Sequence, residues 1–312
     1  MERTANIFRR SIHTFFQNYQ YFTSTAAFLL LPVSVSVLLS QAVEFNSFPL
    51  LPTFLTRLQS LFDAAGFPPS SQFFFLLNLK LSQTISSSIF TFPFSLSFLL
   101  VAKAAIIQAL HHKTSSSPPF SSSFSLYHPL LLTYLCNSFF IISAHATGLC
   151  ILILLFNSFD AFGFSSPSFL FFLSAAGAVL YSVILCNTII ICNLALVVAG
   201  MENCGGFLAI LKACFLIRGR DSAALSLALP VNLGLAFLEA LLQYRLVRAY
   251  HLSRKLSSSA AFEGLLIAYL YSLFILGETI ISCTFYKSCK SGLRIDGEDR
   301  YSHYRIENME EA

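Results

Sequence analysis

A chain of 312 residues that is 55% hydrophobic and only 11% charged does not have the composition of a soluble domain, because soluble domains carry about 25% charged residues. Its net charge of +4 is small, which argues against nucleic acid as a partner and favours the surface of a membrane. We therefore expect an integral membrane protein with an all-α fold.

The apolar runs predict a polytopic bundle of about six transmembrane helices. A helix needs about 20 apolar residues to cross about 30 Å of hydrocarbon. Residues 1–21 form a basic N-terminus without a small-residue cleavage site, so we expect the first run to remain as a signal anchor. Residues 286–312 form a polar tail, which we expect to lack regular structure. Within the membrane domain, residues 22–285, the spans are predicted near residues 22–41, 85–110, 130–156, 168–200, 222–242 and 265–285.

The distribution of lysine and arginine predicts that both termini are cytoplasmic, because cytoplasmic loops carry the excess of these residues. The compartment is then the plasma membrane or the endomembrane system. The connection from Arg245 to Lys255 disagrees, since it holds four positive charges and this topology places it outside. Either this loop is an exception to the rule, or one of the last spans is re-entrant.

Two connecting segments predict interfacial helices. Residues 52–66 carry leucine and phenylalanine at helical spacing, with Arg57 and Asp63 off that face, as in a helix that lies in the membrane boundary. Residues 202–221 hold a double glycine, an apolar stretch too short to span, and a basic turn. This stretch is either a packing helix or a contact for phosphate or anionic lipid headgroups. The candidate contact residues are Lys212, Arg218 and Arg220, and Asp221 is a candidate N-cap for the next helix.

Several of these segments are similar to known proteins. The runs RRSIHTFFQNYQYFTS, LQSLFDAAGFPPSS, LKLSQTISSSIF and MENCGGFLAILKACFLIRGR, with ALSLALPVNLGLAFLEAL, resemble a family of uncharacterised plant multi-span membrane proteins over essentially the whole chain. The turn from Glu202 to Arg220 more remotely resembles one in six-span bacterial proteins and in the membrane domain of some glycerophosphodiester phosphodiesterases. This resemblance implies topology only, because the hydrolytic chemistry of those enzymes belongs to a separate soluble domain.

Ionisable and amide side chains within predicted spans are the candidate functional residues, since such groups are costly in a membrane. Glu278 is the first candidate and His145 the second, and a Glu278–His145 pair would make a proton or cation relay. The alternative is a structural hydrogen bond. Asn187 is a further polar candidate, and Glu239 is placed to reach Arg245.

The remaining motifs give no catalytic or metal site. Five of the eight cysteines lie inside predicted spans and no CxxC pair occurs, so we interpret the thiols as packing groups. Cys289 lies between Lys287 and Lys290, which is compatible with palmitoylation. Because hydrolase, metalloprotease, P-loop and dinucleotide motifs are absent from the sequence, we expect no enzyme, no catalytic residues, no metal and no cofactor.

The leading functional hypothesis is a non-enzymatic scaffold or membrane organiser. Its partners would be the bilayer, anionic headgroups, and a second copy of the chain or other membrane proteins. The alternative is a small-solute or lipid transporter with Glu278, His145 and Asn187 along a polar path. The two differ in whether Glu278 faces a hydrated cavity or a dry helix contact. A lipid-modifying enzyme is third.

Overall fold

The computed structural model describes residues 2–42, 50–64, 72–111, 120–161, 167–247 and 258–310, and every regular element in these ranges is helical. The all-α prediction is therefore confirmed. Three of the elements are single π-helical turns, written η. The elements are α1 (Glu2–Gln17), α2 (Tyr19–Thr25), η1 (Ala26–Leu30), α3 (Leu31–Ala42), α4 (Leu50–Ala64), α5 (Gln72–Phe94), η2 (Ser95–Leu99), α6 (Leu100–His111), α7 (Phe120–Ala161), α8 (Pro167–Glu202), α9 (Phe207–Ile217), α10 (Asp221–Leu242), η3 (Gln243–Val247) and α12 (Ser258–Glu310).

Six helical segments of the described chain are long and apolar enough to span a membrane, as the sequence predicted. The second span begins earlier than expected, because a helix continues through polar residues such as Asn78 and Lys80 that interrupt the apolar run. The segments are Tyr19–Ser40, Phe74–His111, Leu126–Phe159, Phe171–Glu202, Asp221–Arg245 and Ala261–Ser291.

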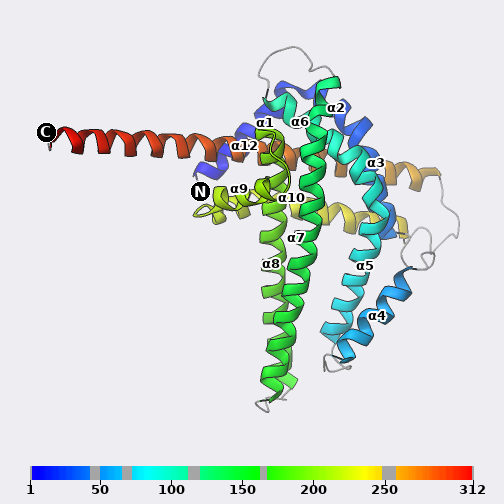
Figure 1. The fold of residues 1–312 in the computed structure, drawn as a ribbon. Helices are drawn as coiled ribbons and strands as arrows, with labels where there is room; N and C mark the ends of the chain where they lie inside the picture. The colour runs from blue at the N-terminus through cyan, green and yellow to red at the C-terminus, as the bar shows by residue number, and fades with distance from the viewer. Residues whose placement is uncertain are drawn as a thin grey trace.

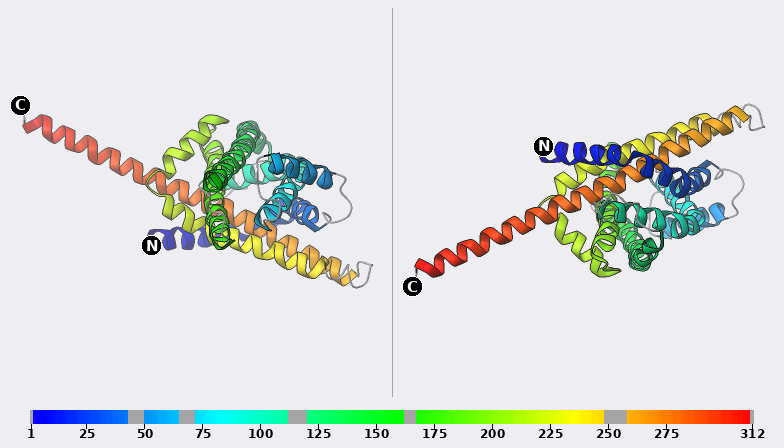
Figure 2. Two further views of the ribbon diagram at one scale, coloured as in Figure 1. Left: turned by 90° about the horizontal axis from the view of Figure 1, so that it is seen from below. Right: turned by 90° about the horizontal axis from the view of Figure 1, so that it is seen from above.

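The six segments do not form one parallel bundle. Helices α7 and α8 pack against each other as a long antiparallel hairpin, whereas the α10 and α12 pair runs across this hairpin (Figure 1). Views from below and above show α1 lying alongside α12 (Figure 2). The fold therefore has two helical layers that cross, and α12 contacts α8 at the crossing.

The main core lies at this crossing. Its largest cluster joins the inner faces of α6, α8, α9 and α12, with Ile107, Ala195, Ala213 and Cys283 almost fully buried. By contrast, large apolar side chains such as Phe28 and Phe171 are 78% exposed on the candidate spans. Such outward apolar surface is expected where a helix faces lipid.

Two local expectations are corrected. Helix α12 continues to Glu310, although we expected residues 286–312 to lack regular structure. Extending an existing helix is far easier than nucleating a new one, which favours this continuation. Asp221 is the first residue of α10 and not its N-cap: the N-cap is Arg220, which makes no capping bond through its side chain.

Candidate functional site

Three polar side chains from three helices meet where the two layers cross. The Asn193 amide of α8 lies between Lys103 of α6 and Glu278 of α12. Lys103 Nζ lies 3.5 Å from Asn193 Oδ1, and Asn193 Nδ2 donates to Glu278 Oε1 at 2.6 Å. We call these residues the Lys103–Asn193–Glu278 cluster.

The chemistry of the cluster explains why it is tolerated in an apolar core. Lys103 is only 7% exposed, and burying a charge is costly unless it is paired and hydrogen-bonded. An amide offers an acceptor oxygen to the ammonium and a donor nitrogen to the carboxylate, so a single asparagine can hydrogen-bond to both neighbours. The cluster consequently fixes the relative positions of α6, α8 and α12.

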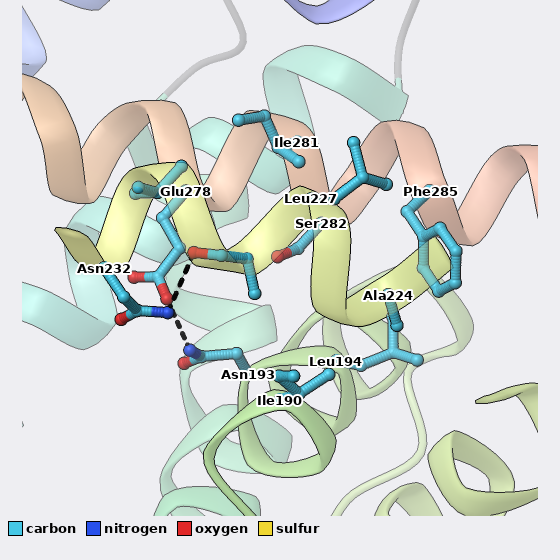
Figure 3. Close-up of a pocket in the computed structure, with 12 residues that line it drawn as sticks. Ile190, Asn193, Leu194, Ala224, Leu227, Asn232, Glu278, Ile281, Ser282 and Phe285 are labelled. Atoms are coloured by element: carbon cyan, nitrogen blue, oxygen red, sulfur yellow. Dashed lines mark hydrogen bonds between the residues drawn. The ribbon is translucent and has the colours of Figure 1, made fainter. Parts of the chain in front are cut away.

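Glu278 and Asn193 also border a cavity of about 40 Å³ between α8, α10 and α12. Figure 3 shows both side chains and Asn232 directed toward it, with Asn232 Nδ2 donating to the carbonyl of Ala228 at 3.0 Å. A buried water needs a cavity of roughly 10–15 Å³, whereas pockets for small molecules occupy roughly 300–1,000 Å³. This cavity therefore has room for water and is much smaller than a typical small-molecule pocket.

The other intramembrane candidates lie elsewhere. His145 Nδ1 is 2.7 Å from Tyr181 Oη, a bond that joins α7 to α8. Asn187 is exposed. The structure therefore does not form a Glu278–His145 pair, because each residue has a different partner, and Asn187 does not join the cluster.

Glu239 does not reach Arg245 as expected. Its Oε1 accepts a hydrogen bond from Tyr271 Oη at 2.9 Å, which links α10 to α12. Arg245 instead lies 3.9 Å from Glu263.

Sequence reasoning missed Lys103 as a site residue. The topology inferred from lysine and arginine treats Lys103 as a cytoplasmic charge, although it falls inside the span predicted at residues 85–110 and has Ala102 and Ala104 as neighbours. The rule that selected Glu278, that an ionisable residue within a span is a candidate, would have found it.

Of the two segments predicted to be interfacial, residues 52–64 lie in α4 and residues 202–221 contain α9. Gly206 has a φ of +76° and donates its backbone N–H to Thr133 Oγ1 at 2.9 Å, so glycine suits this turn. Ahead of the turn, Glu202 binds two lysines: its carboxylate lies 2.8 Å from Lys212 Nζ and 3.0 Å from Lys290 Nζ. The hydrogen bond to Glu202 raises the pKa of Lys212.

The three predicted lipid-contact cations therefore differ. Lys212 is paired with Glu202, and Arg220 Nη1 lies 3.4 Å from the carbonyl oxygen of Cys289. Arg218 is exposed at the C-terminal end of α9. Cys289 is only 2% exposed and packs in the main core, which argues against its palmitoylation in this conformation because acylation requires an accessible thiol.

Within the described ranges, His, Cys, Asp and Glu side chains do not gather in groups of three or more that could hold a metal ion. All eight cysteines are free thiols, and Cys192 and Cys283 are buried. Buried thiols of this kind act as small packing groups.

These features define a helical protein with six candidate membrane spans and a charged cluster in its core. The chain belongs to the family described as "Domain of unknown function (DUF8558)", which matches residues 3–303. Neither a curated protein nor a solved structure matches the chain. The family description assigns no activity or organism, so the plant and phosphodiesterase-domain resemblances stay predictions.

Proposed function

We propose that this protein is a non-enzymatic membrane organiser, which gathers anionic lipids at α9 without a chemical step. The proposal places it in the plasma membrane or the endomembrane system with both termini in the cytoplasm. The observation that supports it is the outward face of α9.

Helix α9 is apolar on both its inner and its outer face. Its inner face packs Ala209, Ala213 and Ile217 into the main core, while Phe207 and Phe215 are 68% and 64% exposed on the outside. The helix has 11 residues and is therefore about 16 Å long, too short to cross a bilayer. A helix with these two faces is best accommodated along the membrane boundary.

A basic turn follows this apolar surface. Gly219, with a φ of +78°, lies in the turn between α9 and α10, and Arg218 is exposed just before it. A cation near an anionic membrane surface contributes about 1 kcal/mol of attraction. We therefore assign the anionic headgroup contact chiefly to Arg218, because Lys212 and Arg220 already have partners within the protein.

The test uses the absence of tryptophan from this chain. Phe215→Trp places the only tryptophan of the variant on the outer face of α9, where it can be excited selectively, in nanodiscs that contain lipids brominated on their acyl chains. We expect stronger quenching when the brominated lipid is anionic than when it is zwitterionic. Phe28→Trp, on the exposed face of the first candidate span, is the control and should be quenched equally by both lipids.

The contribution of Arg218 is tested in the same background. Arg218→Gln should reduce the preference of the Phe215→Trp reporter for anionic lipid, and Arg57→Gln, on α4, should leave it unchanged. A reporter at position 215 that is quenched by neither lipid would contradict the location of α9. Equal quenching by both lipids would contradict the anionic preference.

A transporter is the second candidate, because Glu278 borders a cavity with room for water. It is tested with Glu278→Cys and His145→Cys in a cysteine-depleted chain, treated from each side of the membrane with a small impermeant thiol reagent. Labelling at both positions would support a hydrated path. Protection at both positions in a folded protein would leave the organiser as the better proposal.

A further inference from the structure

A stripe of polar side chains follows one face of α5. Lys80, Gln83, Thr84, Ser87 and Ser88 recur at intervals of three and four residues, the spacing that places side chains on one side of a helix. All five line a cavity of about 390 Å³, whose opposite wall is formed by α10 and η3. We call this cavity the α5–α10 groove.

The groove carries one charge of each sign on opposite walls. Lys80 lies on α5 and Glu239 on α10, and both line the cavity. Among the described residues, the ion pairs within 4.0 Å do not include one between Lys80 and Glu239. The two charges therefore line the same groove without forming an ion pair across it.

A side chain in each wall of the groove is positioned by a hydrogen bond to another helix. Tyr271 Oη donates to Glu239 Oε1 at 2.9 Å, and the hydroxyls of Ser87 and Ser40 are 2.7 Å apart. A carboxylate has about four lone-pair positions, so Glu239 can accept further donors while it stays bonded to Tyr271. The side chain is thus positioned by the protein and still able to bind a cation.

The dimensions and composition fit a small organic ligand. A volume of about 390 Å³ falls within the range of roughly 300–1,000 Å³ that is typical of ligand pockets. Ala236 and Ala240 in the α10 wall leave this space open, and the hydroxyl and amide groups of the α5 wall offer further hydrogen bonds.

We propose that the α5–α10 groove binds a zwitterion, with its ammonium group at Glu239 and its anionic group at Lys80. Two sources have this chemistry: a soluble zwitterion such as phosphoethanolamine, and the headgroup of phosphatidylethanolamine. Lys80 lies near the start of the second candidate span and Glu239 near the end of the fifth, so a lipid headgroup at the membrane boundary can also reach the groove. This site is separate from the lipid contact proposed for α9.

The experiment measures equilibrium binding of radiolabelled phosphoethanolamine to the full chain in phosphatidylcholine nanodiscs. Glu239→Gln and Lys80→Gln each remove one charge with little change in size. We expect each to weaken binding about tenfold or more, since charge-assisted hydrogen bonds are the strong ones. Glu263→Gln and Lys212→Gln are matched controls outside the groove and should change affinity less than about twofold.

The source of the ligand is distinguished by competition. If phosphatidylethanolamine in the nanodisc displaces the labelled probe, and Glu239→Gln relieves that competition, the groove binds the lipid headgroup. If the lipid does not compete, the groove binds the soluble zwitterion. Both outcomes support the site.

Three results would overturn the proposal. The first is that wild-type protein binds no phosphoethanolamine at millimolar concentration. The second is that ethanolamine alone or inorganic phosphate alone binds as tightly as the zwitterion. The third is that folded Glu239→Gln and Lys80→Gln proteins, monodisperse and with unchanged Tm, bind like the wild type. None of these results bears on α9, so this proposal can fail while the organiser proposal still stands.

Discussion

The Lys103–Asn193–Glu278 cluster and the α5–α10 groove contain the same charged residue types, one lysine and one glutamate, in opposite arrangements. In the cluster an asparagine amide connects the two charges, and the adjacent cavity is only about 40 Å³. In the groove, the two charges lie on opposite walls of a cavity of about 390 Å³. We infer that the space between the charges, and not their presence, distinguishes the structural role of the cluster from the binding role proposed for the groove.

The largest effect is expected from breaking the cluster on one side. Glu278→Leu leaves the buried Lys103 without its acidic neighbour, and removing one partner of a buried charge pair costs about 3–5 kcal/mol of stability. Lys103→Met combined with Glu278→Leu should recover most of this loss, because both charges are then gone. The free energy of unfolding in detergent micelles checks this. If the double variant loses as much free energy of unfolding as the two single variants together, the two charges are not coupled.

A smaller effect is expected from removing the amide bridge. Asn193→Leu removes hydrogen bonds to two charged groups and should cost about 2–3 kcal/mol in the same unfolding measurement. Asn232→Leu is the matched control on the same cavity, because the Asn232 amide donates to a carbonyl of its own helix. It should cost about 1 kcal/mol. Equal losses at both positions would mean that Asn193 is not a bridge between charges.

Helix α10 borders both regions, and Gly234 sets its distance from α12. A Cβ at Gly234 would overlap the ring of Phe274, whereas one at Gly277 would meet no atom within 4 Å. Gly234→Ala should therefore cost about 1 kcal/mol, the low end for overpacking, because Phe274 is partly exposed and can move. Gly277→Ala should leave stability unchanged or raise it by up to about 1 kcal/mol. A thermal unfolding scan that ranks the two variants in the reverse order would contradict this packing.

The smallest effect on stability is expected from the groove. Lys80→Gln and Glu239→Gln should each change the free energy of unfolding by less than about 1 kcal/mol, since neither charge depends on a charged partner in the protein. In Glu239→Gln, the carbonyl of the new side-chain amide can still accept the bond from Tyr271. A loss as large as that of Glu278→Leu would show that the groove is structural and would remove the distinction between the two regions.

Much of the local structure could be predicted from the sequence. The apolar runs are long enough to identify six spans, and the short apolar stretch between Glu202 and Asp221 identifies α9. Both inferences depend on length and composition alone. The crossing of the α10–α12 pair over the α7–α8 hairpin does not follow from such patterns, because it depends on contacts between distant residues such as Gly234 and Phe274.

The candidate site was predicted in part. Glu278 was identified because an acidic residue stands out in an apolar run, but its partner was expected to be His145 and is Asn193. Asn187, the asparagine that we selected, lies six residues before Asn193, so the two face different sides of α8. Which face of a span turns inward is decided by packing between helices, and an evenly apolar helix such as α8 gives no sign of it.

The π-helical turn η2 has a consequence for how this chain tolerates changes of length. It lies between Lys80, which lines the groove, and Lys103, which joins the cluster. A π turn holds one residue more than an α turn, whereas each residue of an α-helix rotates it by about 100°. Deleting one residue within Ser95–Leu99 would convert the π turn to an α turn and leave Lys80 and Lys103 on their present sides of the helix. In evolutionary terms, the spacing between the two lysines can shrink by one residue at η2, whereas a deletion in the α-helical parts between them would turn Lys103 away from Asn193.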